Sequence, residues 1–137
     1  METRKDFSCG GVVIDPRDKR MLVVQVENLA GAHVWTFPKG HPENQENETE
    51  AALREVQEET GWLCKVVRPL TEMSYFFVRE GVRYHKTVRW FLMEPVEKTG
   101  TPMEGEILDC RWASPREAKT ILTYPTDMKL LEQLALS

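Results

Sequence analysis

Three glutamates, Glu55, Glu58 and Glu59, lie near the end of a predicted helix in the segment AALREVQEETG (51–61). Residues three and four apart on a helix are neighbours, so these carboxylates project from one side. Like charges at such spacings cost roughly 0.2–0.5 kcal/mol per pair, and the negative end of the helix dipole adds to the repulsion. Divalent cations would relieve it, because Mg²⁺ binds carboxylate oxygens, water and substrate phosphates. A solvated acidic helix face is the alternative interpretation.

A longer pattern surrounds these glutamates. Five residues separate Gly40 from Glu46, seven separate Glu46 from Arg54, and REVQEETGW then runs from 54 to 62. This spacing, G-x5-E-x7-R-E-U-x-E-E-x-G-U, resembles the signature box of the Nudix hydrolase family. The single departure is Trp62, where the family usually has an aliphatic residue, and it concerns local packing rather than the acidic residues.

The resemblance implies a reaction and a set of residues. Nudix enzymes cleave a nucleoside diphosphate linked to another moiety, X, by attack of water on phosphorus. Mg²⁺ or Mn²⁺ is the implied cofactor, with Glu46 in a structural or a direct role. The implied metal ligands are the carboxylates of Glu55, Glu58 and Glu59 and the backbone carbonyl of Gly40. Arg54 resembles the residue that orients a glutamate of the box.

A general base is also required, and family members often supply it as a glutamate from a loop after a long strand. The loop predicted at 95–106 offers Glu104 and Glu106. Glu106 precedes ILDCRW, where related sequences place such a glutamate, and it is the favoured candidate. Glu58 is the alternative base, and a solvated loop charge is the alternative interpretation of Glu106.

Segments on both sides of the box resemble diadenosine polyphosphate hydrolases, namely WTFPKGH (35–41) and the hairpin 74–93. Lys39 could therefore meet a phosphate as a point charge. Lys86 stands on an otherwise apolar strand face and could contact phosphate or extend to water. Tyr75 or Tyr84 could stack on a base or belong to the core.

The substrate is less well defined than the reaction class. Dinucleoside polyphosphate hydrolases usually carry a tyrosine beyond the box where this chain has Val78 and Arg79. A dinucleoside polyphosphate such as diadenosine tetraphosphate is the favoured substrate. A triphosphorylated RNA end, an oxidised dNTP and a nucleotide sugar are the alternatives. A nucleotide-binding sensor without turnover is an alternative of another class, which the complete set of carboxylates disfavours.

The order of predicted elements indicates an α+β fold, and the resemblance implies an α/β/α sandwich with a mixed sheet. Asn47 and Glu50 are expected to cap the box helix, and Gly61 to end it. The segments 7–14 and 21–27 are expected to pair as an early hairpin. Further strands are predicted at 33–37, 63–70, 72–79, 84–93 and 107–114, and helices at 115–122 and 126–136.

Length and composition indicate a single domain over 1–137, because 137 residues suffice for one core. The net charge of −4 disfavours broad nucleic-acid binding, which needs a basic face. Three cysteines without metal-ligand spacing are read as reduced thiols, and the first residues lack the apolar region of a signal peptide. We therefore expect a cytoplasmic, membrane-free protein, either a monomer or a homodimer, with a small nucleotide as its substrate.

Overall fold

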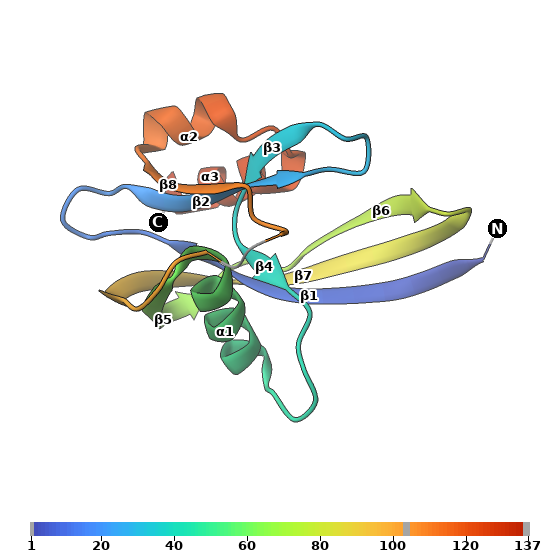
Figure 1. Cartoon of the computed structure of the whole chain (residues 1–137), viewed down its shortest axis with the longest axis horizontal. Helices are drawn as coiled ribbons and strands as arrows, with labels where there is room; N and C mark the ends of the chain where they lie inside the picture. Colours follow the sequence, from blue (N-terminus) through green and yellow to red (C-terminus); the bar gives the residue numbers. More distant parts are fainter. Residues whose placement is uncertain (1, 103–104, 136–137) are drawn as a thin grey trace.

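The computed structural model describes residues 2–102 and 105–135 and contains two β-sheets with helices on their outer sides (Figure 1). The strands are β1 (Thr3–Val13), β2 (Met21–Glu27), β3 (His33–Thr36), β4 (Lys39–Gly40), β5 (Trp62–Pro69), β6 (Met73–Arg79), β7 (Val82–Lys98) and β8 (Asp109–Ala113). The helices are α1 (Glu48–Thr60), α2 (Pro115–Ile121) and α3 (Pro125–Ala135).

The larger sheet has five strands in the order β4-β1-β7-β5, with β6 also paired to β7, and β1 and β7 run parallel. The smaller sheet has the order β3-β2-β8 and is antiparallel. The prediction of an early hairpin is therefore wrong, since β1 and β2 belong to different sheets and share only the bridge between Ile14 and Met21. Each strand is buried along much of its length and has partners on both sides, which a two-stranded hairpin would not give.

β7 is longer than the predicted strand 84–93 and ends at Lys98. Its last residues therefore occupy the first part of the loop predicted at 95–106. Pro95 lies inside the strand, paired with Cys64 next to a register shift in β5. Proline lacks an N–H donor and is tolerated in strands at such irregularities. The proline therefore does not end the strand, and the loop that follows is shorter than predicted.

The box helix α1 has the predicted boundaries because its caps are satisfied. Asn47 accepts a hydrogen bond from the backbone N–H of Glu50, and the Glu50 carboxylate accepts one from Asn47 in return. Gly61 ends the helix with a φ of 79°. A Cβ at this position would lie 2.3 Å from the backbone oxygen of Gly100, so no other residue fits there without a shift of the backbone.

Two apolar clusters lie on the two faces of the larger sheet. One fills the space between α1 and this sheet and includes Ala52, Val56 and Met93. The other joins the larger sheet to β2, β8, α2 and α3 and includes Trp90 and Leu130. This layered arrangement confirms the predicted α+β sandwich and leaves the box helix on one side of the sheet (Figure 1).

Two smaller expectations concern cysteines and membranes. Cys9, Cys64 and Cys110 are all free thiols, as the reading of reduced cysteines requires. In the described part of the chain, none of the helices has the length and apolarity needed to span a bilayer.

A buried hydrogen bond ties α3 to the strand that leads into the box. The hydroxyl of Thr36 donates to Asp127 Oδ2 over 2.7 Å, and both residues are buried. Burial raises the pKa of Asp127 to about 6, against an ordinary value of 3.8. The contact fixes the end of β3, three residues before Lys39.

This shift makes the stability pH-dependent. Because the folded pKa of Asp127 exceeds the unfolded one, the native state binds its proton more tightly, and stability falls as the pH rises from about 4 to 6. Asp127→Asn keeps an acceptor for Thr36 and removes the charge. We expect its free energy of unfolding to rise relative to wild type across this window, by at most about 3 kcal/mol. Urea unfolding of both proteins near pH 4 and pH 7 measures the difference, and a difference independent of pH would contradict the expectation.

Candidate active site

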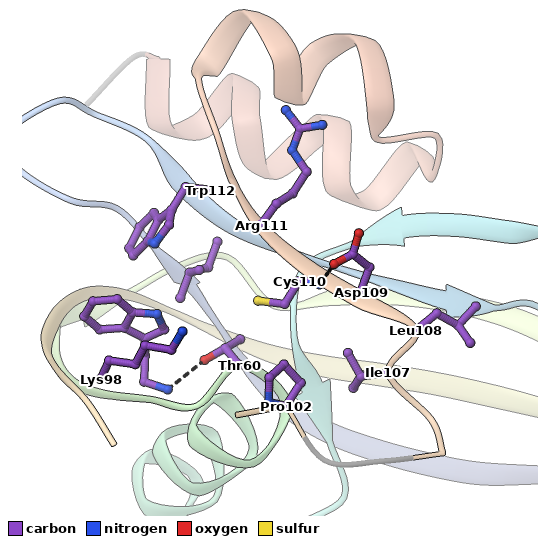
Figure 2. A pocket seen from close by; sticks show the side chains of 11 residues that line it. Thr60, Lys98, Pro102, Ile107, Leu108, Asp109, Cys110, Arg111 and Trp112 are labelled. Carbon is purple, nitrogen blue, oxygen red and sulfur yellow. Dashed lines mark hydrogen bonds between the residues drawn. The ribbon is translucent and has the colours of Figure 1, made fainter. Parts of the chain in front are cut away.

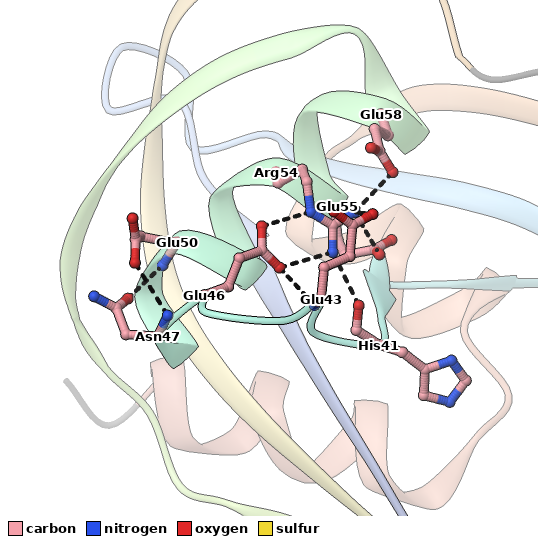
Figure 3. Close-up of polar contacts among 8 residues, drawn as sticks. All are labelled: His41, Glu43, Glu46, Asn47, Glu50, Arg54, Glu55 and Glu58. Carbon is pink, nitrogen blue, oxygen red and sulfur yellow. Dashed lines mark hydrogen bonds and ion pairs between the residues drawn. The ribbon is translucent and has the colours of Figure 1, made fainter.

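The guanidinium of Arg54 is shared among glutamates of the box and the loop before it (Figure 3). Its Nε and Nη2 donate to Glu46, at 2.7 and 3.1 Å. Its Nη1 donates to Glu55 over 2.9 Å and to Glu58 over 3.0 Å, and Nη2 also donates to the backbone oxygen of His41. These hydrogen bonds, the one to Glu46 foremost, raise the pKa of Arg54 and lower that of Glu46.

Glu59 is buried and, among the described residues, has no hydrogen bond to Arg54. Its carboxylate accepts a hydrogen bond from the backbone N–H of Lys39 and contacts the carboxyl group of Glu55. Burial and the charge of Glu55 raise the pKa of Glu59 to about 8, although the Lys39 charge opposes the shift. Burial likewise raises the pKa of Glu55. These two carboxyl groups therefore lack a full complement of positive charge.

Gly40 brings the backbone close to these carboxylates. β4 pairs with β1, opposing Gly40 to Cys9 and Lys39 to Gly10. A Cβ at position 40 would lie only 2.0 Å from Oε2 of Glu55. The absence of a side chain at position 40 is thus what lets the Glu55 carboxylate lie this close to the strand.

The oxygen donors gathered here match the chemistry of a hard divalent cation, which prefers carboxylate and carbonyl oxygens. The raised pKa values of Glu55 and Glu59 mark the place where added positive charge would be most favourable. As the side chains stand, no group of three or more His, Cys, Asp or Glu converges on a metal position within residues 2–102 and 105–135.

A cavity of about 530 Å³ opens beside Glu59. Besides Glu59, its charged lining residues are Glu27, Lys39, Arg79 and Glu106. Glu106 is exposed and, among the described residues, has no ion-pair partner. The structure thus brings three predicted site residues, Glu59, Glu106 and Lys39, to one cavity. Glu104, the other loop candidate for the base, lies outside the described residues.

Lys86 is almost completely buried and does not extend to water. Its ammonium group donates to Ser8 Oγ and to Asp6 Oδ2, the latter over 3.2 Å. Oδ1 of Asp6 lies 2.7 Å from Nε2 of His41, next to Gly40. Burial, followed by the charge of Lys39, lowers the pKa of Lys86. The chain of contacts from β7 through β1 to the start of the box was not predicted, because it joins residues far apart in the sequence.

The two candidate tyrosines occupy the same sheet face as Lys86. Tyr75 opposes Lys86 in the β6–β7 register, and burial raises its pKa to about 12. Tyr84 stacks on Phe77 at a centroid distance of 5.0 Å. Neither tyrosine is among the residues that line the cavity of about 530 Å³. Their assignment to base stacking stays a prediction.

Arg79 is a cavity residue that the sequence reading did not single out as a site residue. It belongs to β6, and in a strand alternate side chains share one face. Arg79 therefore shares the face of Tyr75 and Phe77. This alternation was the sequence signal that could have identified it.

A second cavity of about 320 Å³ lies between the end of α1 and β8 (Figure 2). Trp62 and Trp112 line it and meet edge to face at 5.5 Å between ring centroids. This contact explains how the box accommodates a tryptophan at its last position. Ile107 and Leu108 line both cavities, so the segment after Glu106 separates them.

Comparison with known proteins agrees with this geometry. The NUDIX domain model matches residues 6–134. The chain is 36% identical over 138 residues to the putative mutator protein MutT4 of Mycobacterium tuberculosis, covering 96% of this chain and 55% of that protein. It is 37% identical over 86 residues to the asymmetrical bis(5'-nucleosyl)-tetraphosphatase of Rattus norvegicus, covering 56% of this chain and 50% of that protein. The chain thus spans about half the length of these curated relatives.

Solved structures show the same fold. A NUDIX hydrolase from Nitrosomonas europaea superposes with a TM-score of 0.80 at 21% identity, covering 97% of this chain and 90% of that one. The C. elegans Ap4A hydrolase binary complex gives a TM-score of 0.72 at 22% identity, covering 96% of each chain. Because the family model covers nearly the whole sequence and the box is complete, this chain belongs to the Nudix hydrolase family.

Proposed function

We propose that this protein is a Mg²⁺- or Mn²⁺-dependent pyrophosphohydrolase that cleaves a dinucleoside polyphosphate such as diadenosine tetraphosphate. The observation that carries the proposal is the convergence of Glu59, Glu106 and Lys39 on one cavity. A buried carboxylate, an exposed one and a cation are the groups needed to hold a metal, activate water and bind phosphate.

Glu55, Glu58, Glu59 and the carbonyl of Gly40 are the proposed metal ligands. A bound divalent ion would polarise phosphoryl oxygens and lower the pKa of the attacking water. Arg54 holds Glu55 and Glu58 at fixed positions through hydrogen bonds of 2.9 and 3.0 Å. Its role is to orient these carboxylates, since charge-assisted hydrogen bonds from a guanidinium fix the geometry of the groups that accept them.

Glu106 is the proposed general base. It lines the cavity together with Glu59. The competing candidate, Glu58, is engaged by Arg54. An oxygen of Glu58 is thus already held by a guanidinium, whereas Glu106 has no ion-pair partner among the described residues and is open to water in the cavity. This comparison supports Glu106 over Glu58.

Several features support a polyphosphate substrate. Lys39 lines the cavity. The buried ammonium group of Lys86 lies close enough to Lys39 for the Lys39 charge to lower the pKa of Lys86. These two lysines are proposed to bind the phosphates, and Tyr75 or Tyr84 to stack on a base. The relatives named as bis(5'-nucleosyl)-tetraphosphatase and Ap4A hydrolase also support this substrate class.

A panel of nucleotides tests the proposed function. The purified protein with Mg²⁺ is expected to hydrolyse diadenosine tetraphosphate faster than an RNA 5'-triphosphate, an oxidised dNTP or a nucleotide sugar, as product analysis by ion-exchange chromatography would show. Faster cleavage of the oxidised dNTP would instead favour a function in removing oxidised nucleotides. That outcome would fit the similarity to a putative mutator protein. No hydrolysis of any substrate would favour a nucleotide-binding sensor.

The buried carboxylate gives a second prediction. Glu59→Gln is expected to lower kcat by at least about 100-fold, because a metal ligand is lost. Without metal it should unfold at the same temperature as wild type or higher, since folding no longer has to protonate or desolvate a carboxylate next to Glu55. Glu58→Gln should also lose most activity. A sharp drop in melting temperature of the metal-free variants would show that the carboxylates serve the fold.

The base gives a third prediction. Glu106→Gln is expected to lower kcat by about 10²–10⁴-fold, the usual range for loss of a general base, with little change in KM. Glu27→Gln is the matched control, because Glu27 carries the same charge and lines the same cavity. Equal, small effects of both changes would return the role of base to Glu58. A large effect of Glu27→Gln alone would move the role to that residue.

A further inference from the structure

Arg79 places a cation at the lining of the proposed substrate cavity, on the opposite sheet edge from the box. It is the last residue of β6, and it lines the cavity together with Lys39. Within the described residues, its guanidinium has no ion-pair partner within 4.0 Å, even though Glu27 and Glu106 line the same cavity. An unneutralised guanidinium in a cavity that takes a polyanion is a candidate contact for that anion.

Aromatic rings hold Arg79 in place. The centre of its guanidinium lies 5.3 Å from the ring centroid of Phe77 and 5.9 Å from that of Tyr84. These two rings stack on each other at 5.0 Å with an interplanar angle of 12°. A guanidinium over a ring face is attracted by it and keeps its N–H groups free at the rim. The side chain is thus oriented without consuming its hydrogen-bond donors.

Three cations act on one another here: Lys86 and Arg79 on the β6–β7 hairpin, and Lys39 from β4. The pKa of Lys86 is lowered first by burial, then by the charge of Lys39, and further by that of Arg79. Asp6 neutralises Lys86 through a contact of 3.2 Å. Lys39 and Arg79 remain without ion-pair partners in the part of the chain that the structure describes. Two unpaired cations, Lys39 and Arg79, thus line the cavity, one more than a single phosphate contact at Lys39 uses.

We propose that Arg79 binds a phosphate of the moiety X that lies beyond the pyrophosphate bond being cleaved. Guanidinium groups bind phosphate oxygens in a bidentate manner, which gives both strength and geometry. A dinucleoside polyphosphate carries such a further phosphate, whereas a nucleoside diphosphate sugar does not. Arg79 is therefore a specificity-determining residue that favours polyphosphates. This inference rests on the proposed pyrophosphohydrolase function.

Arg83 provides the matched control for this subsite. It lies on the same hairpin, carries the same charge and contacts a ring, with its guanidinium 5.2 Å from the centroid of Phe76. Phe76 and Phe77 are consecutive in β6 and so point to opposite faces of the sheet. Arg83 is not among the cavity-lining residues. Arg83→Ala therefore removes an arginine from the hairpin without touching the subsite.

The experiment compares two substrates in wild type, Arg79→Ala, Arg79→Lys and Arg83→Ala. With diadenosine tetraphosphate, Arg79→Ala is expected to lower kcat/KM by about 10- to 100-fold, mainly through KM, as for the loss of charge-assisted hydrogen bonds. With ADP-ribose, which has no phosphate beyond the cleaved bond, the change should stay within about threefold. Arg79→Lys should recover part of the loss, and Arg83→Ala should resemble wild type.

Equal losses on both substrates, or equal effects of Arg79→Ala and Arg83→Ala, would overturn the proposal. Calorimetric titration with inorganic tripolyphosphate separates it from the proposed function. If wild type cleaves neither substrate, the proposed hydrolysis fails, but weaker tripolyphosphate binding by Arg79→Ala than by Arg83→Ala would still support the subsite. Unchanged tripolyphosphate binding in Arg79→Ala would overturn it whatever the activity.

Discussion

Arg54 is the guanidinium around which the carboxylates of the box are arranged. It holds Glu46, Glu55 and Glu58 by hydrogen bonds between 2.7 and 3.1 Å, whereas Glu59 is buried beside Glu55 without such a contact in the described part of the chain. Burial shifts the pKa of a carboxylate upward, and that of Glu59 reaches about 8 although the Lys39 charge opposes the shift. One guanidinium is thus shared by three carboxylates and makes no hydrogen bond to Glu59, so both Glu55 and Glu59 still lack positive charge. We propose that a divalent ion bound at Glu59 supplies this charge.

The surrounding fold makes this arrangement possible by bringing backbone and helix close together. β4 runs along β1 at the position where Gly40 leaves room for the Glu55 carboxylate. The capping box at Asn47 and the left-handed Gly61 fix where the helix begins and ends, and hence which residues reach the strand. The stability that the acidic cluster costs is offset by the apolar packing of α1 on the larger sheet.

The sequence predicted local structure better than it predicted contacts between distant segments. The capping residues, the end of the helix at Gly61 and the boundaries of β2 follow from neighbouring residues and are confirmed. The pairing of β1 with β7 is parallel and joins segments about 80 residues apart, which no short-range pattern encodes, and the hairpin expected instead was wrong. The burial of Lys86 was not predicted for the same reason, because its ion-pair partner, Asp6, lies 80 residues earlier in the chain. The cavity position of Arg79 required the sheet geometry.

We infer that Glu59 is the carboxylate of the box that most requires a cation. Calorimetric titration of the metal-free protein with Mn²⁺ tests it most directly, with Glu59→Gln compared against Glu97→Gln, which removes the same charge at an exposed position at the end of β7. We expect saturable Mn²⁺ binding by wild type and Glu97→Gln, and an affinity at least about tenfold weaker in Glu59→Gln, as for the loss of one metal ligand. Equal Mn²⁺ affinity in all three proteins would contradict it.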